Sequence, residues 1–187
     1  MTILEDRKAA ARKAAFARRK EAFARQAPGA AGKLSEVLAG YRGAPLSGFL
    51  PIRTEIDPVP AMAEASAHGP VGVPVIEANG QPLKFARWEP ECTLVDGPFG
   101  AQIPETQIYF EPEVLIVPLV AFSRDGGRLG YGGGFYDRTL EILRSRRPTL
   151  AIGFAFGAQE DVDLPLEETD QPLDLIVTEA EVITPAR

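Results

Sequence analysis

The chain has 187 residues, of which 45% are hydrophobic and 25% charged, a composition typical of a soluble globular protein. This length fits a single domain, residues 1–187, with a substantial core. The formal net charge is −6, whereas residues 1–26 are basic, with eight Lys/Arg against three Asp/Glu. These values exclude a uniformly basic nucleic-acid binder. No apolar run approaches the roughly 20 residues that span a bilayer, so we expect no membrane partner. We also expect a monomer.

One cysteine and one histidine limit the chemistry further. Cys92 alone excludes an internal disulfide and a cysteine-based zinc site, and it fits a reducing compartment. His68 alone argues against a multi-histidine metal centre or a histidine-centred triad. We therefore expect carboxylates to carry any metal or acid–base chemistry. The basic start of the chain could be a transit peptide, but Glu5, Asp6 and Glu21 count against that, and a cytoplasmic location is expected.

The first predicted element is a helix over residues 4–26, where Ala alternates with Lys and Arg without Gly or Pro. Phe16 and Phe23 are seven residues apart and predict a narrow apolar stripe. Lys8 and Arg12 are four apart, so both cations project from one side of the helix. A solvated basic face is the alternative interpretation of this pair.

Short elements follow. Residues 46–53 predict a short strand broken by a proline, and a helix follows with Asp57 as N-cap, Pro58 at its first position and Gly69 as its stop. Within 71–88, the dipeptide Asn79-Gly80 predicts a hairpin. Residues 89–112 are turn-rich, and we expect them to form a long surface excursion.

The second half of the chain predicts a βαβ unit. Residues 113–123 are the most apolar run and lack alternation, which is typical of a strand buried on both faces. A glycine stretch, a helix over 136–147 and a buried strand over 149–156 come next. An acidic loop then leads to a last strand over 175–178. The fold class predicted is α/β, with a three-layer, open, mostly parallel sheet flanked by helices and the basic N-terminal helix added.

The glycine stretch, RLGYGGGFYDR at residues 128–138, predicts an anion site. Glycine permits positive φ and close approach to a ligand, and the N-terminus of the following helix offers unpaired N–H groups to an anion. Arg128 and Arg138 add the charge that phosphate requires. No GK[ST] follows, so this is not a Walker A loop, and Phe135 replaces the third glycine of the dinucleotide fingerprint. A tight structural turn is the alternative.

Asp137, near the start of the predicted helix, has two interpretations. A carboxylate there is favourable to the helix dipole, so it could simply cap the helix. It could instead bind Mg²⁺, which usually takes one or two protein carboxylates together with phosphate oxygens and water. Asp170 or Asp174, in the acidic loop, could supply the second carboxylate.

A longer segment, VPLVAFSRDGGRLGYGGGFYDR, resembles the signature of the 5-formyltetrahydrofolate cyclo-ligase family. That signature runs roughly Pro-x-hydrophobic-Ala/Gly-Phe-Asp-x-x-Gly-x-Arg-Leu-Gly-x-Gly-x-Gly-Tyr/Phe-Tyr-Asp. FLPIRTEID resembles the family's folate-contacting strand, KFARW its central aromatic segment and ETDQPLDLIVTE its acidic tail motif. The resemblance covers essentially the whole chain. It implies ATP- and Mg²⁺-dependent conversion of 5-formyltetrahydrofolate to 5,10-methenyltetrahydrofolate, with release of ADP and phosphate.

The resemblance also implies roles for individual residues. ATP would be bound by two cations of the first helix and by the glycine stretch: Lys8, Arg12, Arg128, Leu129, Gly130, Tyr131, Gly132, Gly133, Gly134, Phe135 and Tyr136. The folate substrate would contact Leu50, Glu55, Trp88, Tyr131, Gly132, Gly133, Gly134 and Phe135, although a core position for the tryptophan is an equal alternative. Asp137 and Asp170 would hold Mg²⁺, and Arg128 and Tyr136 would be catalytic.

Some positions depart from the family pattern. Ser123-Arg124 stands where an Asp is frequent, Phe135 replaces the first tyrosine of Tyr-Tyr-Asp, and Thr106 stands where many members have proline. The Phe135 exchange implies that the missing hydroxyl is not essential. Two rival functions remain: a non-catalytic folate or nucleotide binder on this fold, and a sugar-phosphate isomerase or acyl-CoA transferase on a similar scaffold. The isomerase or transferase would require a general base or catalytic glutamate near the glycine stretch, and none is evident.

Overall fold

The computed structural model describes residues 2–186, and these form the α/β fold predicted. The helices are α1 (Ile3–Arg25), α2 (Gly32–Leu38), α3 (Val59–Ser66) and α4 (Phe135–Arg146), with 3-10 turns η1 (Ala39–Tyr41), η2 (Pro98–Gly100) and η3 (Gly157–Gln159). The strands are β1 (Leu46–Ser47), β2 (Val71–Val75), β3 (Lys84–Trp88), β4 (Leu94–Asp96), β5 (Gln102–Pro104), β6 (Val114–Val117), β7 (Ala121–Phe122), β8 (Arg128–Leu129), β9 (Leu150–Phe154), β10 (Leu175–Val177) and β11 (Val182–Ile183). Within residues 2–186, none of the helices combines the length and the apolar character that a membrane span requires.

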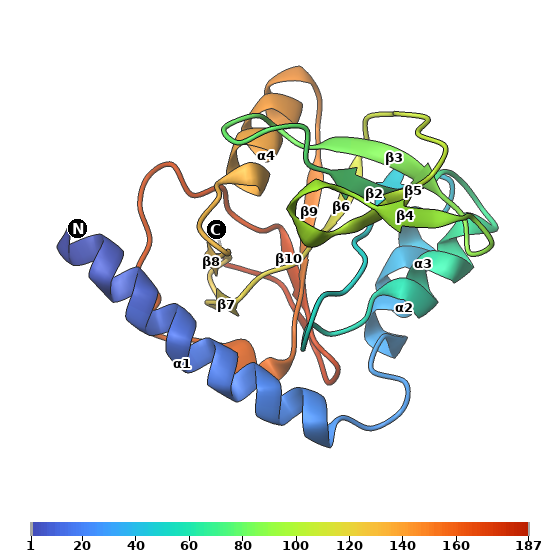
Figure 1. The fold of residues 1–187 in the computed structure, drawn as a ribbon. Coiled ribbons are helices and arrows are strands. Elements are labelled where there is room, and N and C mark those ends of the chain that lie inside the picture. The colour runs from blue at the N-terminus through green and yellow to red at the C-terminus, as the bar shows by residue number, and fades with distance from the viewer. Residues whose placement is uncertain (1, 187) are drawn as a thin grey trace.

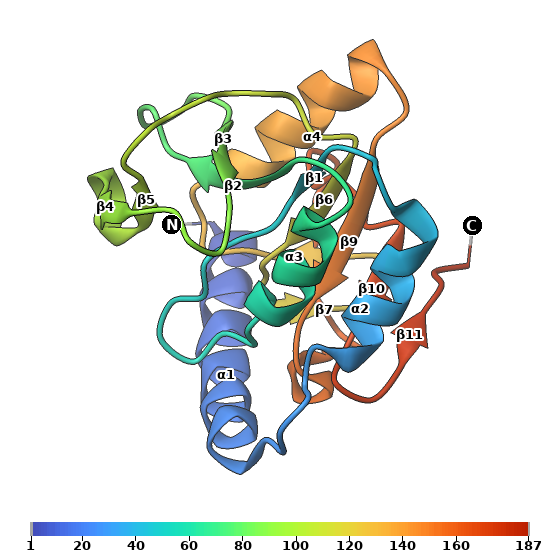
Figure 2. The ribbon, with the colours of Figure 1, turned by 90° about the vertical axis from the view of Figure 1, so that its right-hand side faces the viewer.

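The main sheet has seven strands in the order β11-β10-β9-β6-β1-β2-β3. The five inner strands are parallel, and β11 and β3 add an antiparallel strand at each edge. Figure 2 shows β11 on one side of the molecule and the small β4–β5 hairpin on the other. The chain leaves β1 toward β2 but returns with β6 on the other side of β1. The topological switch point therefore lies between β1 and β6, where open α/β sheets bind ligands.

The sheet is covered on both faces, which gives the three layers predicted. Val114 and Ile116 of β6 pack into the cluster that includes α2 and α3, and Leu115 and Val117 pack into the cluster that includes α4. Figure 1 shows α4 and the α2–α3 pair on opposite sides of the strands. All four β6 side chains are buried, which explains the continuous apolar run in the sequence.

The prediction of one strand over residues 113–123 is wrong in its extent. The sheet strand β6 ends before Pro118, which has no N–H to continue a ladder. The chain then forms an antiparallel hairpin of β7 with β8, closed by a Ser123 N–H that donates to the Gly127 carbonyl at 2.9 Å. Residues 130–134, which hold the glycines of the stretch, consequently follow β8 and not the buried strand directly.

Other local predictions are corrected or confirmed. The strand predicted over 46–53 is reduced to β1, and α3 begins one residue later than predicted, with Asp57 Oδ1 accepting the Val59 N–H at 2.9 Å. The excursion over 89–112 contains the β4–β5 hairpin. The hairpin around Asn79-Gly80 is confirmed as β2–β3, and Gly80 takes the positive φ (+77°) that its turn requires.

Helix α1 forms as predicted, but it docks through cations more than through an apolar stripe. A reciprocal capping box with Thr2 begins it: the Glu5 N–H donates to Thr2 Oγ1 at 3.1 Å and the Thr2 N–H to Glu5 Oε2 at 2.6 Å. Phe16 is partly buried, whereas Phe23 is 39% exposed, so the predicted stripe is only half correct. Arg18 Nε donates to the Ala158 carbonyl at 2.7 Å and so ties α1 to η3.

Candidate active site

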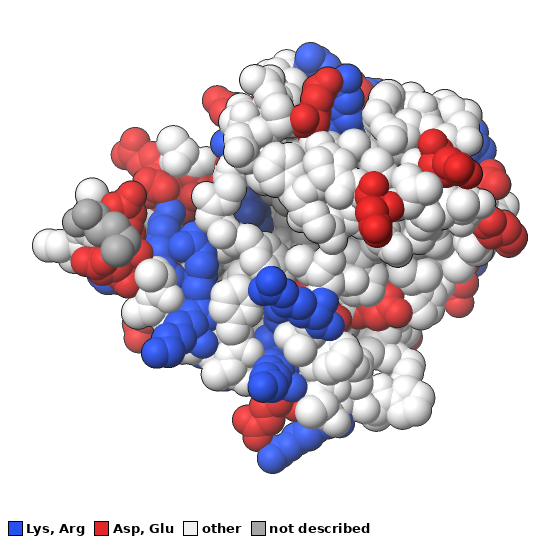
Figure 3. All heavy atoms as spheres, in the orientation of Figure 1, with Lys and Arg blue, Asp and Glu red and all other residues white. Residues whose placement is uncertain are grey.

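A cavity of about 550 Å³ opens at the switch point of the sheet. Its walls come from α1, the chain that follows β1, β2 with the loop after it, η2 with the start of β5, the residue after β6, the glycine stretch with the start of α4, and part of the acidic loop. Figure 3 shows Lys and Arg side chains gathered along α1 and beside the hollow on this face. The structure brings the following predicted site residues to this cavity: Lys8, Arg12, Leu50, Glu55, Arg128, Leu129, Gly130, Tyr131, Gly132, Gly133, Gly134, Phe135, Tyr136, Asp137 and Asp170.

Residues 130–134 of the glycine stretch form the loop between β8 and α4, called the glycine loop, and two of them need to be glycine. Gly132 and Gly134 have φ of +102° and +68°, where a side chain would strain the backbone. Arg12 Nε donates to the Gly130 carbonyl at 2.8 Å, so α1 holds the loop from outside. Gly134 is the N-cap of α4 and no side chain caps the helix, which leaves its first N–H groups available to an anion.

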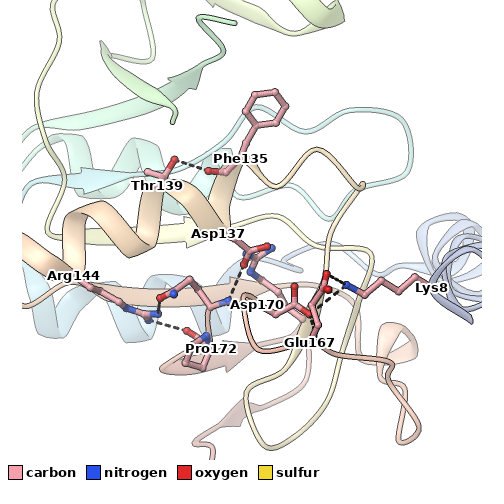
Figure 4. Close-up of polar contacts among 10 residues, drawn as sticks. Lys8, Phe135, Asp137, Thr139, Arg144, Glu167, Asp170 and Pro172 are labelled. Carbon is pink, nitrogen blue, oxygen red and sulfur yellow. Dashed lines mark hydrogen bonds and ion pairs between the residues drawn. The ribbon is translucent and has the colours of Figure 1, made fainter. Parts of the chain in front are cut away.

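Lys8 extends from α1 toward the acidic loop. Its Nζ lies 2.7 Å from Glu167 Oε1 and 3.5 Å from Asp170 Oδ2, and its side chain is only 12% exposed (Figure 4). Arg12 reaches the glycine loop from the next turn of the same helix face. The interpretation of this pair as a solvated basic face is therefore wrong, because both cations line the cavity.

Arg128 and Asp137 form a partly buried ion pair on the cavity wall. The Arg128 side chain is 5% exposed and its guanidinium donates to Asp137 Oδ1, which also accepts the Gln171 N–H at 2.8 Å. Burial lowers the pKa of Arg128, while the charges of Asp137 and Asp170 oppose that shift. Within residues 2–186, Arg128 Nε has no hydrogen-bond partner although it is buried. The site therefore holds a cation with an unused donor.

The two candidates for the second carboxylate are clearly separated. Asp170 lines the cavity with Asp137 and Glu167. Asp174 is not among the cavity-lining residues; its Oδ2 accepts the Ala151 N–H at 2.8 Å and a bond from Arg144 at 3.0 Å. Asp174 thus fastens the end of the acidic loop to the sheet and to α4, which favours Asp170 for the site.

The carboxylates present fit Mg²⁺ by their chemistry. Hard oxygen donors from Asp137 and Asp170 face a cavity that is also lined by the cations Lys8, Arg12 and Arg128. Mg²⁺ commonly takes one or two carboxylates plus phosphate oxygens. Among the described residues, no group of three or more His, Cys, Asp or Glu is arranged to hold a metal alone. A metal ion whose remaining ligands are phosphate oxygens of a bound triphosphate would agree with this arrangement.

The other half of the cavity is mainly apolar, with Glu55 as its buried carboxylate. The apolar walls come from residues after β1, from β2 and its loop, and from η2 and α4: Phe49, Leu50, Ile52, Val73, Pro74, Ile76, Leu83, Phe99 and Phe135. Glu55 is 6% exposed; its Oε1 accepts the Ile52 N–H at 2.8 Å and its Oε2 the Tyr131 hydroxyl at 2.8 Å. Burial raises the pKa of Glu55, and these two hydrogen bonds oppose the shift. Such walls suit a flat heterocycle with N–H donors.

The hydroxyl group of Tyr136 is a further candidate for contact with a ligand. It is buried and has no hydrogen-bond partner within residues 2–186, although Tyr136 lines the cavity. Burial is the main cause that raises the pKa of this phenol, so it stays a donor at neutral pH. A buried polar group without a partner is unfavourable, and one at a cavity wall indicates that a ligand supplies the partner.

Like Arg138 and Asp174, Trp88 is a predicted site residue that does not line the cavity. It is 4% exposed and packs in the core cluster beneath α2 and α3, so the core alternative holds. Several lining residues were missed, among them Phe99 and Glu167. Phe99 is 55% exposed with its ring centroid 6.3 Å from that of Phe135, and Glu167 holds Lys8. Their sequence contexts, a Pro-Phe-Gly turn and an acidic run, marked loops but not a site.

Comparisons with known proteins agree with this geometry. The model of the 5-formyltetrahydrofolate cyclo-ligase family matches residues 3–179. A 5-formyltetrahydrofolate cyclo-ligase of Escherichia coli (strain K12) is 36% identical over 141 residues, 72% of this chain and 77% of the relative. One from Haemophilus influenzae is 38% identical over 101 residues, a match that spans only 54% of that relative.

Solved structures give the same result. The 5,10-methenyltetrahydrofolate synthetase of Aquifex aeolicus superposes with a TM-score of 0.75 at 28% identity, covering 95% of this chain and 92% of that one. The synthetase of Mycoplasma pneumoniae shares the fold, with a TM-score of 0.65 at 22% identity over 92% and 98% of the two chains. The chain thus belongs to the 5-formyltetrahydrofolate cyclo-ligase family of enzymes, as its glycine-rich signature predicts.

Proposed function

We propose that this protein uses ATP and Mg²⁺ to cyclise 5-formyltetrahydrofolate to 5,10-methenyltetrahydrofolate, releasing ADP and phosphate. One observation carries the proposal. A single cavity has a cationic half and an apolar half, and the glycine loop borders both. An enzyme that transfers a phosphoryl group to a folate needs its two substrates adjacent in this way, because positioning is the main task in phosphoryl transfer.

In the proposed complex the triphosphate occupies the cationic half. Lys8, Arg12 and Arg128 neutralise phosphate charge, and the loop from Gly130 to Gly134 contributes backbone N–H groups. Lys8 is held by Glu167 and Asp170, so a triphosphate would compete with these carboxylates for it. Asp137 and Asp170 would hold Mg²⁺, which supplies charge neutralisation at the phosphate oxygens.

The folate occupies the apolar half. Leu50 and Phe135 contact the flat ring, and the buried Glu55 carboxylate accepts N–H groups of the pterin. To accept the pterin N–H groups, Glu55 must be ionised. The hydrogen bonds from the Ile52 N–H and the Tyr131 hydroxyl, together with the charge of Arg19, favour the ionised form against the effect of burial.

The proposed chemistry has two steps. The formyl oxygen attacks the γ-phosphorus, an O–P bond forms and the bond to ADP breaks. N10 then attacks the activated formyl carbon, the new C–N bond closes the ring, and the C–O bond breaks to release phosphate while N10 loses its proton. Arg128 stabilises charge on the transferred group, and the Tyr136 hydroxyl, which lacks a protein partner among residues 2–186, donates to an oxygen of the reacting groups.

A non-catalytic binder would be expected to lose part of the machinery. Lys8, Arg12, Asp137 and Asp170 all line the cavity, which supports the enzyme over that rival. A reducing, cytoplasmic setting is part of the proposal and rests on the single cysteine, Cys92. The monomeric state also stays a prediction.

The test is a coupled measurement on the full chain. Purified protein receives 5-formyltetrahydrofolate, ATP and Mg²⁺, and the absorbance of the methenyl product is followed while ADP is measured. We expect one ADP for each methenyl product and no reaction when ATP or Mg²⁺ is omitted. If no product forms and ATP is not consumed, the proposal fails.

A further inference from the structure

Arg19 is a buried cation that the site described above does not use. Its residue is 1% exposed, its Nε donates to Thr54 Oγ1 at 2.9 Å and its Nη1 to the Tyr131 hydroxyl at 2.5 Å. The guanidinium carbon lies 5.0 Å from the ring centroid of Phe16 and 5.8 Å from that of Tyr131. Over residues 2–186, no carboxylate lies within ion-pair distance of it. Because burying a charge without a counterion is unfavourable, the position of Arg19 calls for a specific explanation.

The nearest hydrogen-bonded route from Arg19 to a negative charge leads to Glu55. The Tyr131 hydroxyl accepts from Arg19 and donates its own proton to Glu55 Oε2 at 2.8 Å. The second oxygen of Glu55 is held by the Ile52 N–H. One phenol thus joins a cation of α1 to the buried carboxylate of the apolar half, and charge-assisted hydrogen bonds of this kind fix geometry strongly.

The three residues of this hydrogen-bonded series, Arg19, Tyr131 and Glu55, come from three different segments of the protein. Arg19 belongs to α1, which also carries Lys8 and Arg12; Tyr131 belongs to the glycine loop; and Glu55 follows β1. Any shift of the glycine loop would move the donor that orients Glu55.

We propose that Arg19 is a positioning residue that acts through the Tyr131 hydroxyl to orient the Glu55 carboxylate for the folate and to couple that orientation to the glycine loop. This proposal rests on the proposed function, because it assigns Glu55 to the folate half. Arg19 itself touches neither substrate. Its role is to keep the acceptor ionised and aimed while the neighbouring loop carries the triphosphate.

The electrostatics of Glu55 make the role measurable. Burial raises the pKa of Glu55, whereas the Ile52 N–H, the Tyr131 hydroxyl and the Arg19 charge oppose the rise. The titratable and charged groups that interact with Glu55 are Arg19 from α1, Tyr131 from the glycine loop and Tyr136 from α4. Removing the Arg19 charge leaves burial less opposed, so Glu55 would take up a proton at a higher pH and cease to be a full acceptor.

The test compares Arg19→Met and Tyr131→Phe with the unmodified full chain. Each variant should raise the KM for 5-formyltetrahydrofolate about tenfold, because a hydrogen bond to a charged group is broken, and should change the KM for ATP much less. In Arg19→Met the acid limb of the kcat/KM profile for the folate should also move to higher pH. The double variant should be little worse than either single one, since both break the same chain of bonds.

Arg18→Met is the matched control. It removes the adjacent cation of α1, whose guanidinium bonds the Ala158 and Glu160 carbonyls at 2.7 and 3.3 Å and does not line the cavity. Its folate KM and acid limb should equal those of the unmodified chain. Circular dichroism checks folding, and if Arg19→Met does not fold, Tyr131→Phe carries the KM comparison with almost no change in volume.

The outcomes separate the two proposals. Unchanged folate KM and an unchanged acid limb in folded variants, or additive effects in the double variant, would overturn the role of Arg19 while turnover by the unmodified chain upholds the function. If the unmodified chain shows no turnover, calorimetric titration with 5-formyltetrahydrofolate alone, repeated over pH, makes the same comparison of affinities. Absence of folate binding to the unmodified chain would overturn both.

Discussion

Replacing Tyr136 by Phe should make the protein more stable and less active. The substitution removes one oxygen that is buried and has no hydrogen-bond partner within residues 2–186. A buried polar group left unsatisfied costs about 1–3 kcal/mol. We expect the free energy of unfolding to rise by at least about 1 kcal/mol, which in a domain of this size raises Tm by about 2–4 °C. If the hydroxyl donates to the reacting groups, kcat should fall by about 10²–10³-fold, as when one donor to a transition-state oxygen is lost.

Tyr131→Phe is the natural control, because it removes the same atom from a tyrosine 5 positions earlier whose hydroxyl is fully engaged. That hydroxyl accepts from Arg19 and donates to Glu55. Its loss leaves both buried partners short of one bond and should lower the free energy of unfolding by about 1–3 kcal/mol. One substitution type at two positions should therefore shift stability in opposite directions.

Thermal denaturation without substrates measures the stability effect, and initial rates with both substrates saturating measure kcat. A fall in Tm for Tyr136→Phe, similar to that for Tyr131→Phe, would show that the Tyr136 hydroxyl is satisfied in the folded protein and would refute the reasoning. A rise in Tm with an unchanged kcat would refute the catalytic role alone.

Three further substitutions test the site. Asp137→Asn should abolish most turnover while circular dichroism stays unchanged, and unaltered activity would remove Asp137 from the metal site. Lys8→Ala should raise the KM for ATP about tenfold through loss of a charge-assisted contact, with a small effect on the folate KM; an unchanged ATP KM would contradict its role. Glu55→Gln should stabilise the protein more at neutral than at acid pH, measured by urea unfolding across pH. Burial raises the pKa of Glu55 above 4.5, so ionisation of Glu55 lowers the free energy of unfolding. This loss of stability is absent below pH 4.5, appears as pH rises through the shifted pKa, and is complete above it. A stability difference between Glu55→Gln and the unmodified chain that does not depend on pH would contradict this.

Most of the fold could be predicted because its signals are local. Neighbouring residues in the sequence are enough to predict several elements. These are the apolar strands β6 and β9, the turn at Asn79-Gly80, and helix α1 with its uninterrupted Ala/Arg pattern. The β7–β8 hairpin was missed because its strands have two residues each, too few for a periodic pattern. Its pairing depends on the ending of β6 at Pro118.

The charged and glycine residues of the cavity wall could be predicted from the sequence, because the resemblance to the family implies them. The contacts that the sequence could not supply are those between segments far apart in the chain. Lys8 and Glu167 are separated by 159 positions, and Arg19 and Tyr131 by 112. Nothing in the run Arg18-Arg19-Lys20 distinguishes the buried cation from its neighbours. Only the docking of α1 across the carboxyl end of the sheet selects Arg19.

The central claim is that the formyl oxygen of the folate attacks the γ-phosphate of ATP where the two substrates adjoin beside the glycine loop. It is tested most directly by following an oxygen-18 label placed in the formyl group of 5-formyltetrahydrofolate. After one turnover with ATP and Mg²⁺, the released phosphate is examined by mass spectrometry. The account predicts that the label is found in the phosphate, because that oxygen forms the new O–P bond and leaves with phosphorus. Phosphate without the label, formed together with the methenyl product, would contradict it.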